Sequence, residues 1–122
     1  MRTGKIFEGV VKIADSPYTT DVITVGEAEI SLIVINNLAS SSTLDVTFEG
    51  SVEGTRFVPI EVEESNILVT SLNLSPNESR AVTTTTPWPF LRCSIDVTIA
   101  NSVNPIYVEW SARQARHQPN SI

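Results

Sequence analysis

Hydrophobic and polar residues alternate along most of this chain, and no stretch of helical length shows the periodicity of an amphipathic helix. The segment Thr43–Val52 is the clearest example, because its apolar side chains fall on one face and its Thr, Asp, Glu and Ser side chains fall on the other. The segments Leu91–Ala100 and Ile106–Arg113 repeat the pattern, which is typical of half-buried strands in antiparallel sheets. The predicted core positions are Leu44, Val46, Phe48, Leu91, Cys93, Ile95, Val97, Val108 and Trp110, and Val52, Ile99, Ile106 and Ala112 extend the same inward faces.

Less regular strands are expected between these three, separated by polar turns rich in Gly, Pro, Asn, Asp and Ser. The predicted ranges are Lys5–Ile13, Asp21–Val25, Glu29–Asn36, Phe57–Glu63, Ile67–Leu74 and Arg80–Thr85. About eight or nine short strands at this spacing predict one all-β domain, an antiparallel β-sandwich of the jelly-roll type. We expect an N-terminal strand or arm over residues 1–13, the sandwich over 14–113 and a C-terminal tail over 114–122.

The N-terminal predicted strand has apolar residues on both faces. Phe7, Val11 and Ile13 lie on one face, and Ile6 and Val10 lie on the other. Two interpretations stay open: an ordinary central strand, or a strand that adds to the open sheet edge of a neighbouring copy. Under the second interpretation Ile6, Phe7 and Val10 are candidate subunit contacts.

Charge limits the possible partners more than it limits the fold. The 122 residues carry 14 acidic and 8 basic side chains, for a formal net charge of −6, so binding to nucleic acid phosphates is not expected. Ten of the acidic residues lie between Asp21 and Glu78, whereas the chain after that point holds Arg80, Arg92, Arg113 and Arg116. Either this is ordinary solvated surface, or an acidic patch on one copy meets a basic patch on the next, with Arg113 and Arg116 among the contacts.

Few residues suit catalysis. The single histidine, His117, lies in the predicted tail, and the single cysteine, Cys93, falls on an inward face where a buried, inert thiol is expected. The sequence has no Ser–His or Cys–His arrangement of a recognisable kind, no zinc-ligand spacing and no glycine-rich phosphate loop. We therefore predict no enzymatic activity, no catalytic residue and no cofactor.

The acidic residues Glu61, Glu63 and Glu64 are candidate oxygen ligands for calcium. They lack the alternating Asp or Asn and the glycine of a calcium-binding loop, so a solvated strand face and turn is the preferred interpretation. We predict no metal site.

Membrane attachment and classical secretion are not expected. The N-terminal segment has no long apolar region of the kind that secretory signals contain. The longest apolar run, Ile30–Ile35, is interrupted by Ser31 and is too short to cross a bilayer.

Trp88 lies between two prolines, Pro87 and Pro89, at the entrance to a predicted core strand. Because proline lacks an N–H donor and favours an extended backbone, this segment is expected to be a stiff corner. We favour a hydrophobic plug as the role of Trp88, because burial of its large ring is favourable at low entropic cost. A subunit contact and a platform for a sugar ring remain the alternatives.

Several motifs together resemble a small, uncharacterised β-sandwich domain that occurs in spore-forming bacteria and their phages. The resemblance covers roughly residues 29–114. The matching segments are SLIVINN, LDVTFEGSVEGTRFVPI, LNLSPNESRAV, PWPFLRCSIDV and IYVEWSARQ. The hairpin motif consists of Gly50, Ser51, Glu53, Gly54, Thr55 and Phe57, with Glu53 where Asp or Asn is commoner. The resemblance implies a spore-appendage, coat or virion subunit, with no known active site.

From this combination we expect a non-enzymatic structural subunit that assembles with copies of itself into a fibre or appendage on a spore or cell surface. A phage virion protein, for capsid decoration or a tail, is the main alternative, and a carbohydrate-binding β-sandwich module is the third. The expected partners are other copies of the chain and other proteins of the particle or spore surface, and the expected location is that particle or surface after assembly.

Overall fold

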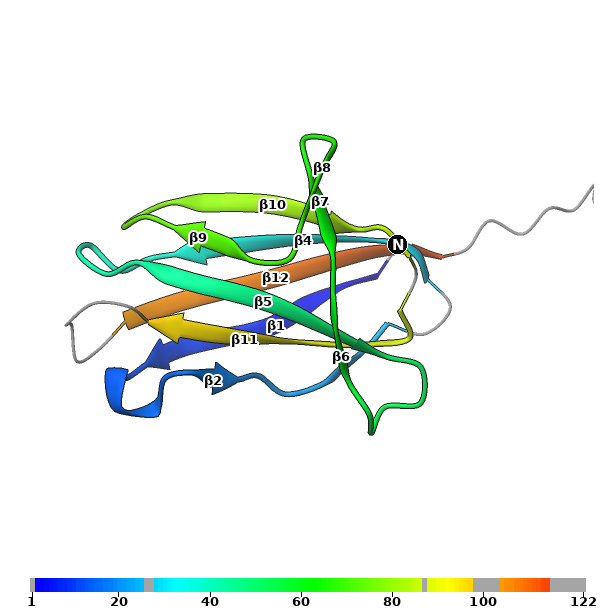
Figure 1. The fold of residues 1–122 in the computed structure, drawn as a ribbon, viewed down its shortest axis with the longest axis horizontal. Helices are drawn as coiled ribbons and strands as arrows, with labels where there is room; N and C mark the ends of the chain where they lie inside the picture. The colour runs from blue at the N-terminus through cyan, green and yellow to red at the C-terminus, as the bar shows by residue number, and fades with distance from the viewer. Residues whose placement is uncertain (1, 26–27, 87, 98–103, 115–122) are drawn as a thin grey trace, which may run out of the picture.

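The protein is an all-β sandwich of two antiparallel sheets, as predicted (Figure 1). The computed structural model describes residues 2–25, 28–86, 88–97 and 104–114, with only the backbone described at 2, 28–31, 113 and 114. Each sheet has six strands, and every strand pairing in the described part of the chain is antiparallel.

Sheet A has a linear strand order. In that order its strands are β1 (Arg2–Val11), β12 (Asn104–Gln114), β4 (Ala28–Asn37), β10 (Ser79–Thr84), β7 (Val62–Glu64) and β8 (Ile67–Val69). Sheet B is built around the two long alternating strands predicted from the sequence. Its strands are β2 (Tyr18–Thr19), β11 (Phe90–Val97), β5 (Leu44–Ser51) and β6 (Val58–Ile60), with β3 (Ile23–Thr24) on β11 and β9 (Leu72–Leu74) on β5. One 3₁₀ turn, η1 (Ile13–Asp15), follows β1.

The described residues form twelve strands and not the eight or nine predicted, because two predicted strands each divide between the sheets and β2 was not predicted. The predicted strand Phe57–Glu63 becomes β6 in sheet B and β7 in sheet A, and Ile67–Leu74 becomes β8 in sheet A and β9 in sheet B. Ile60 and Val62 are both buried on either side of the crossing. An alternating pattern continues unbroken through such a crossing, since both sheets bury their inner faces in one core.

The core lies between the two sheets and contains all nine predicted core residues, each buried. Ile106 and Ala112 are buried as expected, while Ile99 lies outside the described residues. Val52 was expected to face inward and is instead 73% exposed. The reason is that β5 ends at Ser51, so the alternation stops one residue before Val52.

Of the two interpretations of the N-terminal strand, the ordinary central strand is wrong, because β1 lies at the edge of its sheet. A bulge in β1 between Lys5 and Phe7 adds one residue opposite β12, and this turns Ile6 into the core. Val10 is 50% exposed, and Ile13 lies beyond the strand in η1, where it is also exposed. β1 is therefore a half-buried strand at the edge of sheet A, paired along its length with β12 of its own chain.

Buried hydrogen bonds close one end of the sandwich, which we call the polar end. The amide of Asn37 donates to the carbonyls of Ser42 (2.8 Å) and Ser75 (3.0 Å) and accepts from the backbone N–H of Ala39. The Ser42 hydroxyl donates to Asn104, whose own amide donates to the backbone of β1. These bonds fasten the β4–β5 loop to sheet A.

Trp88 closes the opposite end, which we call the apolar end. Its ring lies on Gly50 so closely that a Cβ at residue 50 would be only 2.5 Å from the indole. Gly50 faces Leu91 across the sheet on the inner face, and the ring packs against the core cluster. Val25 donates its backbone N–H to Pro89 at 2.7 Å beside it. The structure thus places Trp88 as a half-buried plug.

Candidate functional site: the outer face and open edge of sheet A

The described residues offer no catalytic constellation. No group of three or more His, Cys, Asp or Glu side chains in that part of the chain could hold a metal ion. Burial raises the pKa of the Cys93 thiol to about 12, so it is inert as predicted. His117 lies outside the described residues. No described helix is long and apolar enough to cross a membrane.

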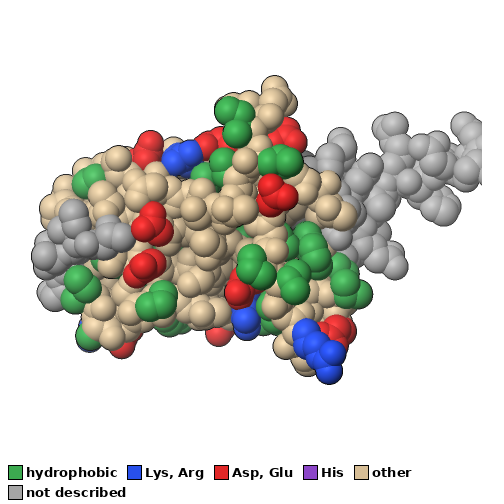
Figure 2. Space-filling view, in the orientation of Figure 1, with side chains coloured by type: hydrophobic (Ala, Val, Ile, Leu, Met, Phe, Trp, Pro, Cys, Tyr) green, Lys and Arg blue, Asp and Glu red, His purple; other side chains and the backbone are tan. Residues whose placement is uncertain are grey.

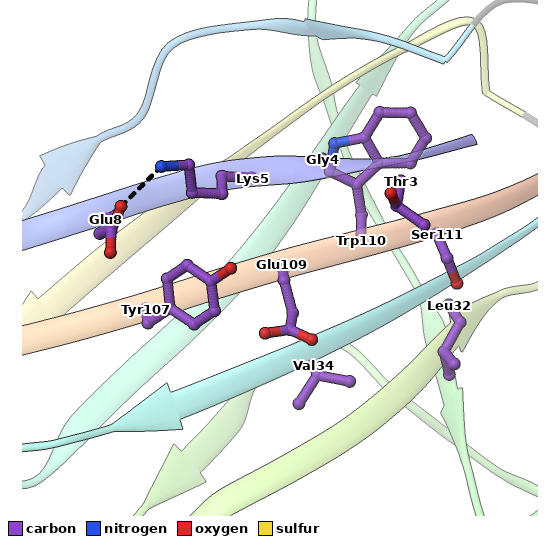
Figure 3. A pocket seen from close by; sticks show the side chains of 10 residues that line it. All are labelled: Thr3, Gly4, Lys5, Glu8, Leu32, Val34, Tyr107, Glu109, Trp110 and Ser111. Atoms are coloured by element: carbon purple, nitrogen blue, oxygen red, sulfur yellow. Dashed lines mark hydrogen bonds and ion pairs between the residues drawn. The ribbon is translucent and has the colours of Figure 1, made fainter.

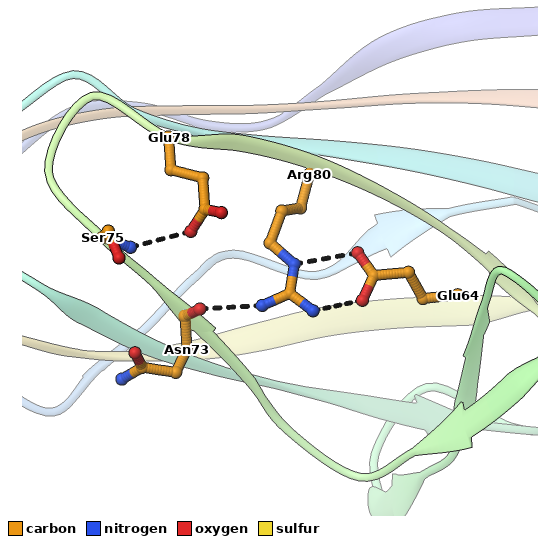
Figure 4. A network of polar contacts seen from close by, with 5 residues as sticks. All are labelled: Glu64, Asn73, Ser75, Glu78 and Arg80. Carbon is orange, nitrogen blue, oxygen red and sulfur yellow. Dashed lines mark hydrogen bonds and ion pairs between the residues drawn. The ribbon is translucent and has the colours of Figure 1, made fainter.

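The three candidate calcium ligands are not brought together. Glu61 is exposed at the crossing between the sheets, and Glu63 pairs in register with Thr83 on the outer face of sheet A. Glu64 instead forms a bidentate ion pair with Arg80, whose hydrogen bond holds the pKa of Glu64 below its usual value (Figure 4). Arg80 also donates to the Asn73 carbonyl at 2.8 Å, so this cluster ties sheet A to sheet B.

The proposed acid-to-base polarity along the chain is weakened by pairing within the molecule. Arg80 is engaged with Glu64, and Arg92 bonds Glu49 at 2.6 Å while its guanidinium stacks 4.0 Å from the Phe57 ring centroid. Neither arginine is free for a neighbouring copy. Arg116 and the side chain of Arg113 lie outside what the structure describes.

The candidate subunit contacts near the N-terminus separate into three kinds. Ile6 belongs to the core of its own chain, at 5% exposure, and is not accessible to a neighbouring copy. Phe7 packs on Tyr18 with ring centroids 5.2 Å apart, which closes the side of the sandwich between β1 and β2. Only Val10 presents a largely free side chain.

Among the described residues, the outer edge of β1 is the longest open strand edge. No strand among the described residues pairs with that edge, and β1 has ten residues. The other described strands that pair on only one side, β2, β3, β6, β8 and β9, have two or three residues each. An exposed edge presents unpaired backbone N–H and C=O groups that another chain can bind.

Hydrogen bonds in the neighbouring strand reveal which β1 groups face this edge. The N–H of Leu38 donates to the Pro105 carbonyl at 3.1 Å, so the backbone of Pro105 faces β4 and not β1. Val10 is opposite Pro105, and Val10–Pro105 is therefore a non-hydrogen-bonded pair. Because backbone direction alternates, Val10 and Glu8 direct their N–H and C=O groups to the open edge, whereas Gly9 bonds to β12.

A shallow groove of about 400 Å³ crosses the outer face of sheet A beside this edge (Figure 3). It runs over β1, β12 and β4. Its floor carries the Glu109 carboxylate, which lies between the side chains of Tyr107 and Val34. Leu32 adds a further apolar wall, and the exposed ion pair of Lys5 with Glu8 (2.6 Å) forms the rim.

Sequence reasoning missed this groove. Its residues come from three strands that are far apart in the sequence, and most of them occupy outward positions that look like solvated surface. The register between the strands would have predicted the groove, because Lys5 and Val34 both lie directly opposite Glu109. That register depends on strand order, which the alternation does not specify.

Comparison with known proteins finds a similar fold but no family. No protein-family model and no curated protein matches the chain. Among solved structures, the crystal structure of SPBc2 prophage-derived protein YomS, from a Bacillus prophage, aligns with 90% of this chain and 92% of its own, at 18% sequence identity and a TM-score of 0.60. This comparison supports the resemblance at the level of the fold, because the chain shares its β-sandwich fold with a prophage-derived protein.

Proposed function

We propose that this protein is a non-enzymatic structural subunit that associates with copies of itself through the open edge of β1. The observation that carries the proposal is the contrast between this ten-residue edge and the short edges elsewhere. Two identical edges pair most simply in antiparallel orientation about a two-fold axis, which makes one continuous sheet from two copies of sheet A.

The sequence of β1 restricts how such pairing can occur. The bulge at Ile6 and the charged side chains of Lys5 and Glu8 are features that discourage indiscriminate pairing at an edge. The regular segment after the bulge, where Glu8 and Val10 direct their backbone groups outward, is the part that fits a partner strand. Pairing is therefore expected in one register and not as a sliding contact.

The fold comparison favours a phage particle over a spore surface as the setting. The similar structure is prophage-derived, and a protein that assembles with copies of itself suits a virion component. The capsid and the tail are equally compatible with an edge-mediated contact.

The direct test is the oligomeric state of the Val10→Pro variant. Proline has no N–H and blocks strand addition, yet at Val10 no ladder bond to β12 is lost. By light scattering after size-exclusion chromatography, the wild type is expected to be dimeric or larger, and Val10→Pro is expected to have a smaller mass than the wild type, with a nearly unchanged unfolding midpoint.

Two controls make this result specific. Val10→Ala keeps the N–H and should still associate, whereas Gly9→Pro removes a bond to β12 and should lower stability. Deleting the N-terminal strand is not a suitable test, because Ile6 and Val11 are buried in the core. A wild type that is monomeric at every concentration would refute the proposal, as would a Val10→Pro variant that associates like the wild type.

A further inference from the structure

The loop between β5 and β6 projects from the sandwich as a stiff knob (Figure 1). Two hydrogen bonds fix its shape: Gly54 N–H donates to the Ser51 hydroxyl at 2.8 Å, and Arg56 N–H donates to the Glu53 carboxylate at 2.6 Å. Gly54 adopts a φ of +94°, a conformation that favours glycine, and the Phe90 ring packs 3.4 Å from its Cβ position. A loop fixed in this way loses little conformational entropy when it binds a partner.

The knob carries an apolar and a basic group at its surface. Val52 is the most exposed of the large hydrophobic residues described, and Arg56 is exposed as well. The Arg56 side chain makes no ion pair with any described residue, in contrast to Arg80 and Arg92. Glu53 is exposed on the same loop, and Figure 2 shows basic and acidic side chains together at the tip of the lobe that projects from this side of the molecule.

The groove on sheet A has the complementary character. The Glu109 carboxylate makes no hydrogen bond or ion pair with the described residues, although it is only partly exposed. The Tyr107 ring lies on one side of it and aliphatic side chains lie on the other (Figure 3). A carboxylate next to an aromatic ring suits a guanidinium group, which binds carboxylates through two parallel hydrogen bonds and stacks on aromatic faces.

We infer that the β5–β6 knob of one copy docks in the sheet A groove of another copy, an inference that rests on the proposed function of self-association. Arg56 binds Glu109 against the Tyr107 ring, and Val52 packs on Leu32 and Val34. One molecule cannot make this contact with itself, because the knob belongs to sheet B and the groove lies on the face of sheet A that points away from it.

The contact differs in symmetry from pairing at the β1 edge. A knob and a groove are different surfaces, so each copy offers one of each and the contact is head-to-tail. Edge pairing alone stops at two copies, whereas the added head-to-tail contact extends the assembly into a fibre or closes it into a ring.

The test isolates this contact by blocking the β1 edge in every protein used. A knob donor carries Val10→Pro and Glu109→Arg, and a groove acceptor carries Val10→Pro and Arg56→Ala. Each is expected to be monomeric alone, and their mixture is expected to form a 1:1 complex in sedimentation velocity. A matched control protein carries Val10→Pro and Lys12→Ala; Lys12 is an exposed base outside the knob, so this protein keeps both knob and groove and is expected to associate with itself.

The outcomes distinguish a failure of the knob contact from a failure of pairing at the β1 edge. A 1:1 complex that weakens at least about tenfold when the donor also carries Arg56→Glu supports the inference. No complex, together with wild-type dimers that depend on Val10, overturns the knob contact and leaves edge pairing intact. A complex without Val10-dependent dimers supports the knob contact and overturns edge pairing.

Discussion

The two ends of the sandwich are closed by different chemistry. At the polar end, Asn37, Ser42 and Asn104 form buried hydrogen bonds with each other and with the backbone of β1 and the β4–β5 loop. At the apolar end, the Trp88 ring covers Gly50 and contributes buried apolar surface instead of hydrogen bonds. Both ends exclude water from one core, yet only the first demands particular atoms at particular positions.

This difference predicts how each end responds to change. A buried hydrogen-bonding group that loses its partner keeps its full desolvation penalty, so the polar end should tolerate almost no substitution. A plug held by packing can shift or be replaced by another large apolar group at smaller loss. Four measurements test this comparison.

The largest effect is expected for Asn37→Ala at the polar end. Its side chain, 1% exposed, satisfies two carbonyls and one N–H, and removing it takes a hydrogen-bond partner from the Ser42 carbonyl and the Ala39 N–H, whose bonds are buried. We expect the free energy of unfolding in urea to fall by about 3 kcal/mol or more. The matched control is Asn73→Ala, which removes one exposed bond to Asp45 and should lose less than about 1 kcal/mol. Equal losses in the two variants would show that the polar network has no special role.

Gly50→Ala should have the next largest effect, because it disrupts the packing of the Trp88 ring at the apolar end. The new Cβ would lie 2.5 Å from the Trp88 ring, so the ring must move off the core. We expect a loss of about 2 kcal/mol in the same unfolding measurement. Gly9→Ala is the control, since its Cβ would meet only the Phe7 ring at 3.4 Å, an ordinary contact. If Gly50→Ala matched the control, Trp88 would not close this end.

Stability at alkaline pH tests whether the two ends keep water away from Cys93, in the middle of sheet B. Burial raises the pKa of Cys93 from 9.0 to about 12, so the neutral thiol is favoured in the folded state. This contribution is present in full below about pH 8 and is lost as pH rises toward the folded pKa. At pH 10 we expect a loss of about 1 kcal/mol that Cys93→Ala does not show. The same pH dependence in both proteins would indicate a solvated thiol.

The smallest effect is expected at the long side of the sandwich, where Arg80 and Glu64 are partly exposed. The Arg80 hydrogen bond lowers the pKa of Glu64, so the stabilisation is present above the unfolded pKa of about 4.5 and is lost as pH falls through the folded value. Solvent screening limits it to less than about 1 kcal/mol. As pH falls, the free energy of unfolding should decrease slightly less in Glu64→Gln than in the wild type. A larger difference would show that the ion pair is more buried than it is in the structure.

Much of the fold follows from the sequence, because alternation is a local property. The inward faces of Leu44–Phe48 and Leu91–Val97 could be predicted from a period of two, since each strand buries one face whatever its neighbours are. The inert state of Cys93 followed from the same alternation. Trp88 as a plug was predicted from its two prolines, which fix an extended corner at a strand entrance.

Strand order, register and side-chain pairing were decided only by the tertiary structure. The bulge that buries Ile6, the crossing between Ile60 and Val62, and the internal pairing of Arg80 all arise from contacts between distant segments. The groove at Glu109 and the open edge at Val10 exist for the same reason, because each depends on which strand lies beside which. A sequence determines which face of a strand is apolar, but the neighbour across the sheet is chosen by the packing of the whole core.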